Sequence, residues 1–177
     1  METKTTEVQE YLKNPNENTP NLKDYKTIKT YDDACAALGE KVDEVVLTNA
    51  GVPKHIIALM KLELVCKALW GGEVKVYPDP NGNRIYYYPW FSFCSKYALE
   101  HMVRKKSDLL LLDDADCSAY GGWGVIGTDG RFSGADMHGG FRLCLDTREK
   151  ATYFGIQFLE LWAQYLTYNF RVGERLK

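Results

Sequence analysis

Three aspartates that follow the apolar run 109–112 are the side chains best suited to metal chemistry. Asp113, Asp114 and Asp116 could offer carboxylate oxygens, the ligands that Ca²⁺ and Mg²⁺ prefer. The spacing Asp114-x-Asp116 matches one step of the calcium-loop pattern, but the rest of that pattern is not met. We therefore interpret these residues as a polar loop and expect no cofactor. A metal-assisted hydrolase that uses them with His138 is an alternative.

A glycine-rich segment, 119–140, contains the letters of a dinucleotide fingerprint. The spacing G-x-G-x-x-G begins at Gly122, but no hydrophobic strand directly precedes it, and residues 128–130 would break a following helix. The Gly-Lys-Ser/Thr of a phosphate-binding loop is also missing. Because glycines at this density permit tight turns, we expect short strands and an irregular loop.

Histidine and cysteine could also support catalysis or metal binding. Of the three histidines, only His138 lies in a glycine-rich loop, a setting common for binding sites. The five cysteines are spread along the chain without a zinc-type spacing, and the first ten residues are polar. These observations favour a reducing cytoplasm, where the thiols serve as small core hydrophobes.

Charge and hydropathy argue against two classes of partner. The formal net charge is -2, so no overall positive field would attract nucleic acid. No apolar run approaches the roughly 18 residues that a membrane-spanning helix needs. We therefore expect neither a nucleic-acid partner nor a membrane, and a homo-oligomer stays open.

The densest group of aromatic side chains lies between residues 86 and 93. If this stretch is a strand, Tyr86 and Tyr88 face one side and Tyr87 the other, because successive strand residues alternate. Either a second layer covers the other face, or some of these rings form a binding surface. The candidate ligand- or partner-binding residues are Tyr87, Trp90, Trp123, Arg131, His138 and Arg142.

Capping and breaking residues predict three helices. Thr30 is a suitable N-cap for a helix that ends at Gly39, and Pro53 suits the start of the next one. After Thr147, apolar residues recur at three- and four-residue steps as far as Tyr165. This is the clearest helical periodicity in the chain and predicts one long C-terminal helix.

Alternating patterns predict the strands. Segments 73–77 and 84–88 flank a turn at 79–83 and predict a hairpin, while 141–145 predicts a further strand. With a glycine-rich strand, they would form a small antiparallel sheet of about four strands packed by helices. We therefore expect an α+β fold. The expected organisation is a flexible arm or linker over 1–24, one domain over 25–170, and a charged, frayed tail over 171–177.

Several segments resemble a known family. They are the stretch 25–39 (YKTIKTYDDACAALG), the aromatic stretch 87–91 (YYPWF), Arg142-Leu143-Cys144, and Ala151-x-x-x-Gly155-x-Gln157-Phe158. Together they are similar, from about Tyr25 to Tyr168, to uncharacterised proteins found in phages and integrated mobile elements of gut bacteria. That family has no assigned activity, so the resemblance implies no catalytic residues. It implies a phage accessory protein in the bacterial cytoplasm, or one associated with the virion.

We therefore expect a non-enzymatic binding module that uses the aromatic cluster and the glycine-rich loop. Its partner would be a host protein, or a small anionic ligand held by Arg131 and Arg142. A virion structural or assembly protein is an alternative, because the N-terminal linker could then dock on a neighbour.

Overall fold

The structure, a computed structural model, describes residues 19–77, 81, 83–95, 97–98, 101, 109–114, 120–132, 141–167 and 170–175. In chain order its helices are η1 (Tyr25–Thr27), α2 (Tyr31–Leu38), α3 (Glu44–Asn49), α4 (Lys54–Leu69), η3 (Phe141–Leu143), α6 (Arg148–Gln157) and α7 (Leu159–Leu166). Its strands are β1 (Ile85–Ser95), β2 (Leu109–Asp114), β3 (Tyr120–Phe132) and β4 (Phe170–Arg175).

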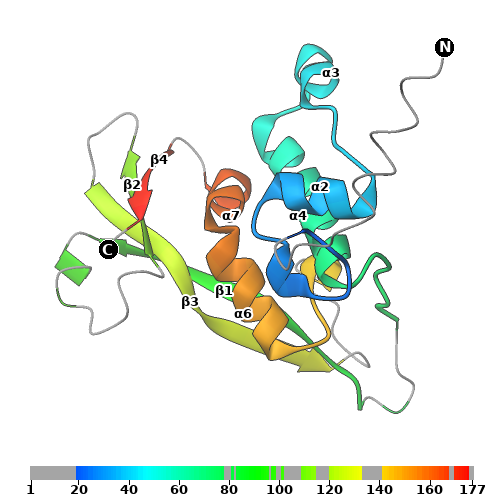
Figure 1. Cartoon of the computed structure of the whole chain (residues 1–177). Helices are drawn as coiled ribbons and strands as arrows, with labels where there is room; N and C mark the ends of the chain where they lie inside the picture. The colour runs from blue at the N-terminus through cyan, green and yellow to red at the C-terminus, as the bar shows by residue number, and fades with distance from the viewer. Residues whose placement is uncertain are drawn as a thin grey trace.

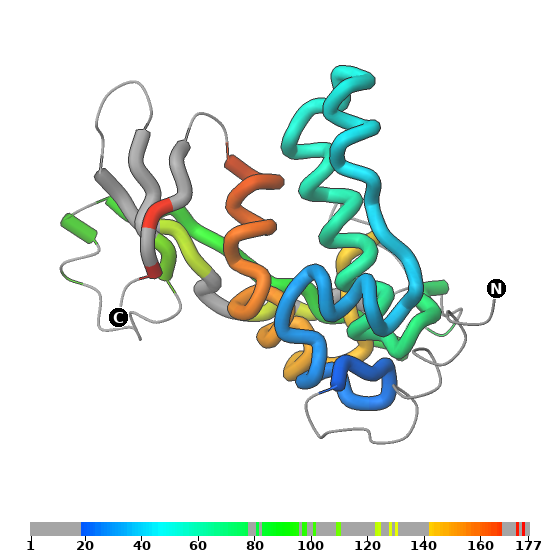
Figure 2. Tube along the Cα trace, turned by 45° about the horizontal axis from the view of Figure 1, so that its top comes forward, coloured from blue at the N-terminus to red at the C-terminus, as the bar shows by residue number. Residues whose placement is uncertain are grey.

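Sheet and helices form separate layers. Helices α6 and α7 lie between the sheet and α4, and α2 packs against α4 (Figures 1 and 2). Helix α3 projects from the helical layer in both views. The predicted α+β class and the antiparallel sheet are confirmed. Helix α4 contacts α2, α6 and α7, and seven of its residues are buried, whereas Ile56 and Met60 are exposed.

Within the described residues, four strands form an antiparallel sheet in the order β1-β3-β2-β4. The glycine-rich stretch, predicted as short strands and an irregular loop, contains the long strand β3, which pairs on both edges. Gly130 shows one reason, since a Cβ there would lie 2.9 Å from Ile85 Cγ2 and 3.0 Å from Tyr87 Cε1. At this position glycine permits a close approach by the side chains of β1, not a tight turn.

The predicted hairpin over 73–88 is wrong, because 73–77 is not a strand. Leu145 instead bridges β1 at Tyr87, through two backbone hydrogen bonds of 2.8 and 2.9 Å, on the edge that does not pair with β3. The 73–77 segment contacts β1 through a side chain, because the Tyr86 hydroxyl lies 3.2 Å from the carbonyl oxygen of Lys75. The predicted turn at 79–83 lies mostly outside the described residues.

The strand predicted over 141–145 is also wrong. Residues 141–143 form the short helix η3, and only Leu145 makes a strand-like bridge. Leu143, Cys144 and Leu145 are all buried, so the chain there does not alternate between two faces. The indole Nε1 of Trp70 donates to the carbonyl oxygen of Cys144 at 2.8 Å, which satisfies a group that a sheet ladder would otherwise pair.

The single long helix predicted after Thr147 is two helices that meet at Phe158. Phe158 has φ -106° and ψ 28°, outside helical values. The guanidinium of Arg175 donates from Nη2 to the carbonyl oxygens of Ile156 at 2.8 Å and Gln157 at 3.2 Å. Competing donors on helix carbonyls are an established cause of kinks, and a cation at a helix C-terminus is favourable.

The C-terminal segment is not a frayed tail. Residues 170–175 form β4 and pair with β2, with Leu112 opposite Val172. Arg175 thus belongs to a strand of the sheet while its side chain contacts the end of α6. The far end of the chain therefore helps to hold the helical layer on the sheet.

The predicted helix caps are confirmed. Thr30 and Asp33 form a capping box at the start of α2, and Gly39 ends that helix in the left-handed region with φ 68°. Pro53 precedes α4, and the Thr147 hydroxyl accepts a hydrogen bond from the backbone N–H of Lys150. Of the predicted N-terminal arm, residues 1–18 lie outside the described residues.

Candidate functional site

The predicted aromatic binding surface is divided between the two faces of β1. Tyr87 and Phe91 pack against the helical core, as strand alternation requires. Trp90 lies on the opposite face and keeps 50% of its surface exposed. Tyr87 and Trp90 therefore cannot contact one ligand from the same face of the sheet.

Trp123 is a core residue, so its predicted role in binding is wrong. Its side chain is 1% exposed and stacks on Phe91, with ring centroids 4.6 Å apart and an interplanar angle of 7°. The ring of Phe91 in turn packs against that of Trp162 in α7, with centroids 4.9 Å apart. This aromatic stack joins the sheet to the helical layer.

The predicted charged site residues do not form a described cluster. Arg131 is in β3 opposite Tyr86, but its side chain is outside the described part, as is all of His138. Arg142 in η3 is exposed, and its Nη1 lies 3.6 Å from Oε1 of Glu63.

The predicted aspartate site is not a described cluster either. Asp113 and Asp114 belong to strand β2 and not to a loop, with their backbones opposite Tyr120 and Phe170, respectively. Their side chains and all of Asp116 lie outside the described part of the chain. Among the residues that are described, no three His, Cys, Asp or Glu side chains group as metal ligands.

The described cysteines do not offer a reactive pair. Burial raises the pKa of the Cys66 thiol, and burial raises that of Cys144 to about 12. The thiolate, which is the nucleophilic form, is therefore disfavoured in both. Both residues pack as small apolar groups, and the Cys66 Sγ lies 3.5 Å from the carbonyl oxygen of Cys144.

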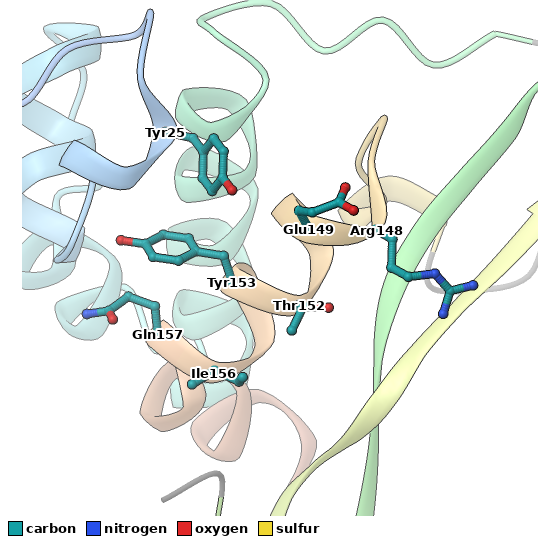
Figure 3. Close-up of a pocket in the computed structure, with 7 residues that line it drawn as sticks. All are labelled: Tyr25, Arg148, Glu149, Thr152, Tyr153, Ile156 and Gln157. Carbon is teal, nitrogen blue, oxygen red and sulfur yellow. The ribbon is translucent and has the colours of Figure 1, made fainter.

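An open trough of about 460 Å³ lies along α6. Six of its seven lining residues come from α6, and Tyr25 of η1 forms the remaining wall (Figure 3). The lining residues are Tyr25, Arg148, Glu149, Thr152, Tyr153, Ile156 and Gln157. None of the predicted site residues belongs to this set.

Helical periodicity gives α6 its two faces. Ala151, Phe154 and Gly155 are buried at steps of three and four residues. Thr152 and Ile156, four residues apart, are left on the side that lines the trough.

The segment 25–30 passes along α6 and forms the second wall. The side chain of Ile28 is fully buried and anchors this segment in the core. The Tyr153 hydroxyl donates to the carbonyl oxygen of Ile28 at 2.9 Å, and Gln157 Nε2 donates to that of Lys29 at 2.7 Å. Both walls are thus held in place without a ligand.

The two tyrosines meet at nearly a right angle. The rings of Tyr25 and Tyr153 have centroids 5.3 Å apart and an interplanar angle of 77°. Burial, and to a smaller extent the negative charges of Asp33 and Asp24, raise the pKa of the Tyr153 hydroxyl to about 12. The hydroxyl therefore stays protonated near neutral pH and remains a hydrogen-bond donor.

The two charged residues of the trough point in different directions. Arg148 points toward the sheet (Figure 3), where its Nη1 donates to the carbonyl oxygen of Thr128 at 3.2 Å. Its guanidinium also lies 5.4 Å from the centroid of the Tyr87 ring. Glu149 is exposed at the rim, and its carboxylate makes no ion pair with any described residue. The described lining therefore carries one charge of each sign, with the cation directed to the sheet and the carboxylate at the rim.

Comparison with known proteins gives no relative. No family model, no curated protein and no solved structure matches the chain. In the part of the chain that the structure describes, no helix is both long and apolar enough to cross a membrane.

The trough could not be predicted from the sequence, because its walls are 128 positions apart along the chain, from Tyr25 to Tyr153. No sequence motif links the residues of η1 to those of α6. In the sequence, Tyr153 is simply one of several aromatic residues in a predicted helix. Only the contact between the two segments creates the site.

Proposed function

We propose that this protein is a non-enzymatic binding module, and that it binds a short segment of a protein partner in the trough on α6. The observation that carries the proposal is the preformed wall of Tyr25 and Tyr153, fixed by the 2.9 Å hydrogen bond to Ile28. Binding to walls that are already ordered avoids the entropic cost of ordering them. Ligand sites are typically concave and largely preformed, with few polar groups.

A protein partner and a small anionic ligand are the two partners expected from the sequence. A protein partner fits the open shape of the trough, which would leave one side of an extended segment in solvent. A small anionic ligand fits less well, because Arg148 is directed to the sheet and the carboxylate of Glu149 makes no ion pair with a described residue. A phage or mobile-element origin rests on the sequence resemblance alone and remains part of the proposal.

A selection of random peptides against the immobilised full chain tests this function. Thr152→Trp places a bulky ring in the trough, whereas Gln164→Trp adds the same ring at an exposed position of α7 outside the lining. We expect enriched peptides to bind the wild type and the Gln164→Trp variant and to lose binding to Thr152→Trp. No enrichment, or equal binding to both variants, would contradict the proposal.

An assembly protein is a second candidate, and an exposed apolar tip favours it. Val45 and Val46 of α3 are 69% and 60% exposed, and Ile56 and Met60 of α4 are also exposed. Exposed apolar patches often mark protein interaction sites. In sedimentation experiments at rising concentration, we expect an oligomer that the double variant Val45→Glu, Val46→Glu dissociates. A chain that stays monomeric at every concentration would exclude self-assembly through this tip.

A further inference from the structure

The trough has features that select for positive charge, and this inference rests on the proposed binding function. Its aromatic walls are two tyrosine rings in edge-to-face contact, and the ring faces that this contact leaves open attract cations. The walls are nearly perpendicular, so one group in the corner between them can contact both. Aromatic corners of this kind suit an ammonium or a guanidinium group better than an anion.

Negative charges near the tyrosine walls also favour a cationic ligand. Glu149 is on the rim and makes no ion pair with a described residue, and Asp24 and Asp33 lie close enough to the Tyr153 hydroxyl to affect its pKa. Arg148, the cation among the described lining residues, is directed toward the sheet (Figure 3), where it contacts Thr128 and Tyr87. The lysines of the 23–29 segment are exposed and do not belong to the lining.

Polar and apolar groups in the trough match the two parts of a basic side chain. Gln157 uses its Nε2 as a donor to Lys29, which leaves its amide oxygen as an acceptor. The Thr152 hydroxyl is a second acceptor in the lining. Ile156 offers an apolar surface for the methylene stem that lysine and arginine bury beside a charged head.

We infer that the trough binds a lysine or arginine side chain of a partner polypeptide, with Tyr25 and Tyr153 as the aromatic walls and Glu149 as the counter-charge. The peptide backbone would lie along the open side of the trough. The partner surface is therefore basic and extended.

Titration of the isotopically labelled full chain with two capped tripeptides tests the inference. The probes are acetyl-glycyl-arginyl-glycine amide and its citrulline analogue, which has nearly the same shape without the charge. We expect the arginine peptide to shift the backbone amide resonances of Thr152 and Gln157 in a saturable way, and the citrulline peptide to bind more weakly. Raising the salt concentration should weaken only the arginine peptide.

Matched variants assign the effect to the trough. Glu149→Gln and Tyr25→Leu should each weaken the arginine peptide about two- to five-fold, as expected for an exposed charge pair or cation–π contact. Glu160→Gln removes the same charge from an exposed position of α7 outside the lining and should leave the affinity unchanged. Butylammonium tests whether a free small cation suffices, and we expect it to bind far more weakly than the peptide.

The two proposals fail in different ways. If the arginine and citrulline peptides bind equally, or if Glu149→Gln and Glu160→Gln have the same effect, the cation preference is wrong. If peptides without basic residues are selected and still depend on Thr152, the binding function stands and only the cation inference fails. If neither tripeptide binds and no selected peptide depends on Thr152, both proposals fail.

Discussion

Replacing Trp123 with alanine is expected to lower the free energy of unfolding by about 3–5 kcal/mol. The indole is almost fully buried in the sheet and stacks on Phe91, which contacts Trp162 across the interface between sheet and helices. Its removal leaves a cavity where the two layers meet, and neighbouring side chains can only partly fill it. Urea denaturation followed by circular dichroism measures the change, provided that the m-value is retained.

Trp90 supplies the matched control for this experiment. It belongs to the strand that pairs with the Trp123 strand, but half of its surface is exposed. Trp90→Ala should therefore cost about 1 kcal/mol or less. Equal losses for the two tryptophans would show that the aromatic stack is not the junction between the layers.

Phe154→Ala is the second substitution with a large expected effect, again about 3–5 kcal/mol. Phe154 is fully buried in α6. Its ring packs edge to face with those of Phe158 and Trp162, with centroids 6.0 Å and 5.0 Å apart, respectively. Such aromatic pairs contribute more than their buried area alone. Calorimetric or urea unfolding of the full chain should show the loss.

This variant also tests the helical stripe from which the single C-terminal helix was predicted. Leu166→Ala removes a large side chain from the same helical layer, but Leu166 is 40% exposed. Its cost should be much smaller than that of Phe154→Ala. A Phe154→Ala protein with an unchanged unfolding midpoint would contradict the placement of α6 over the sheet.

The helices could be predicted because their signals are local. The Thr30 capping box and the Gly39 stop act within one helical turn, and the same is true of Thr147. The interruption at Phe158 could not be predicted in this way. Arg175 donates hydrogen bonds to the carbonyl oxygens of Ile156 and Gln157, and it lies on a strand whose position depends on the whole sheet.

The strands were harder to predict than the helices, because strand pairing depends on two segments of the chain. The 73–77 segment alternates as a strand should, yet Leu145 bridges the edge of β1 that it would need. The glycine-rich stretch has the composition of a loop, yet Gly130 is in a strand because side chains of β1 lie against it. In both places, the deciding contact is distant along the chain.

The candidate site shows the same division. The sequence indicated a binding module and pointed to the aromatic residues around Tyr87, but neighbouring strand residues face opposite sides and Trp123 is buried. The tyrosines that do form a concave surface belong to segments with no sequence pattern in common. By itself, then, the sequence determined the α+β class, the capped helices and the apolar stripe of α6 and α7, since these depend on residues within a few turns of one another. The tertiary structure alone decided the sheet order, the break at Phe158 and the trough between Tyr25 and Tyr153, because each requires a contact between segments that only folding brings together.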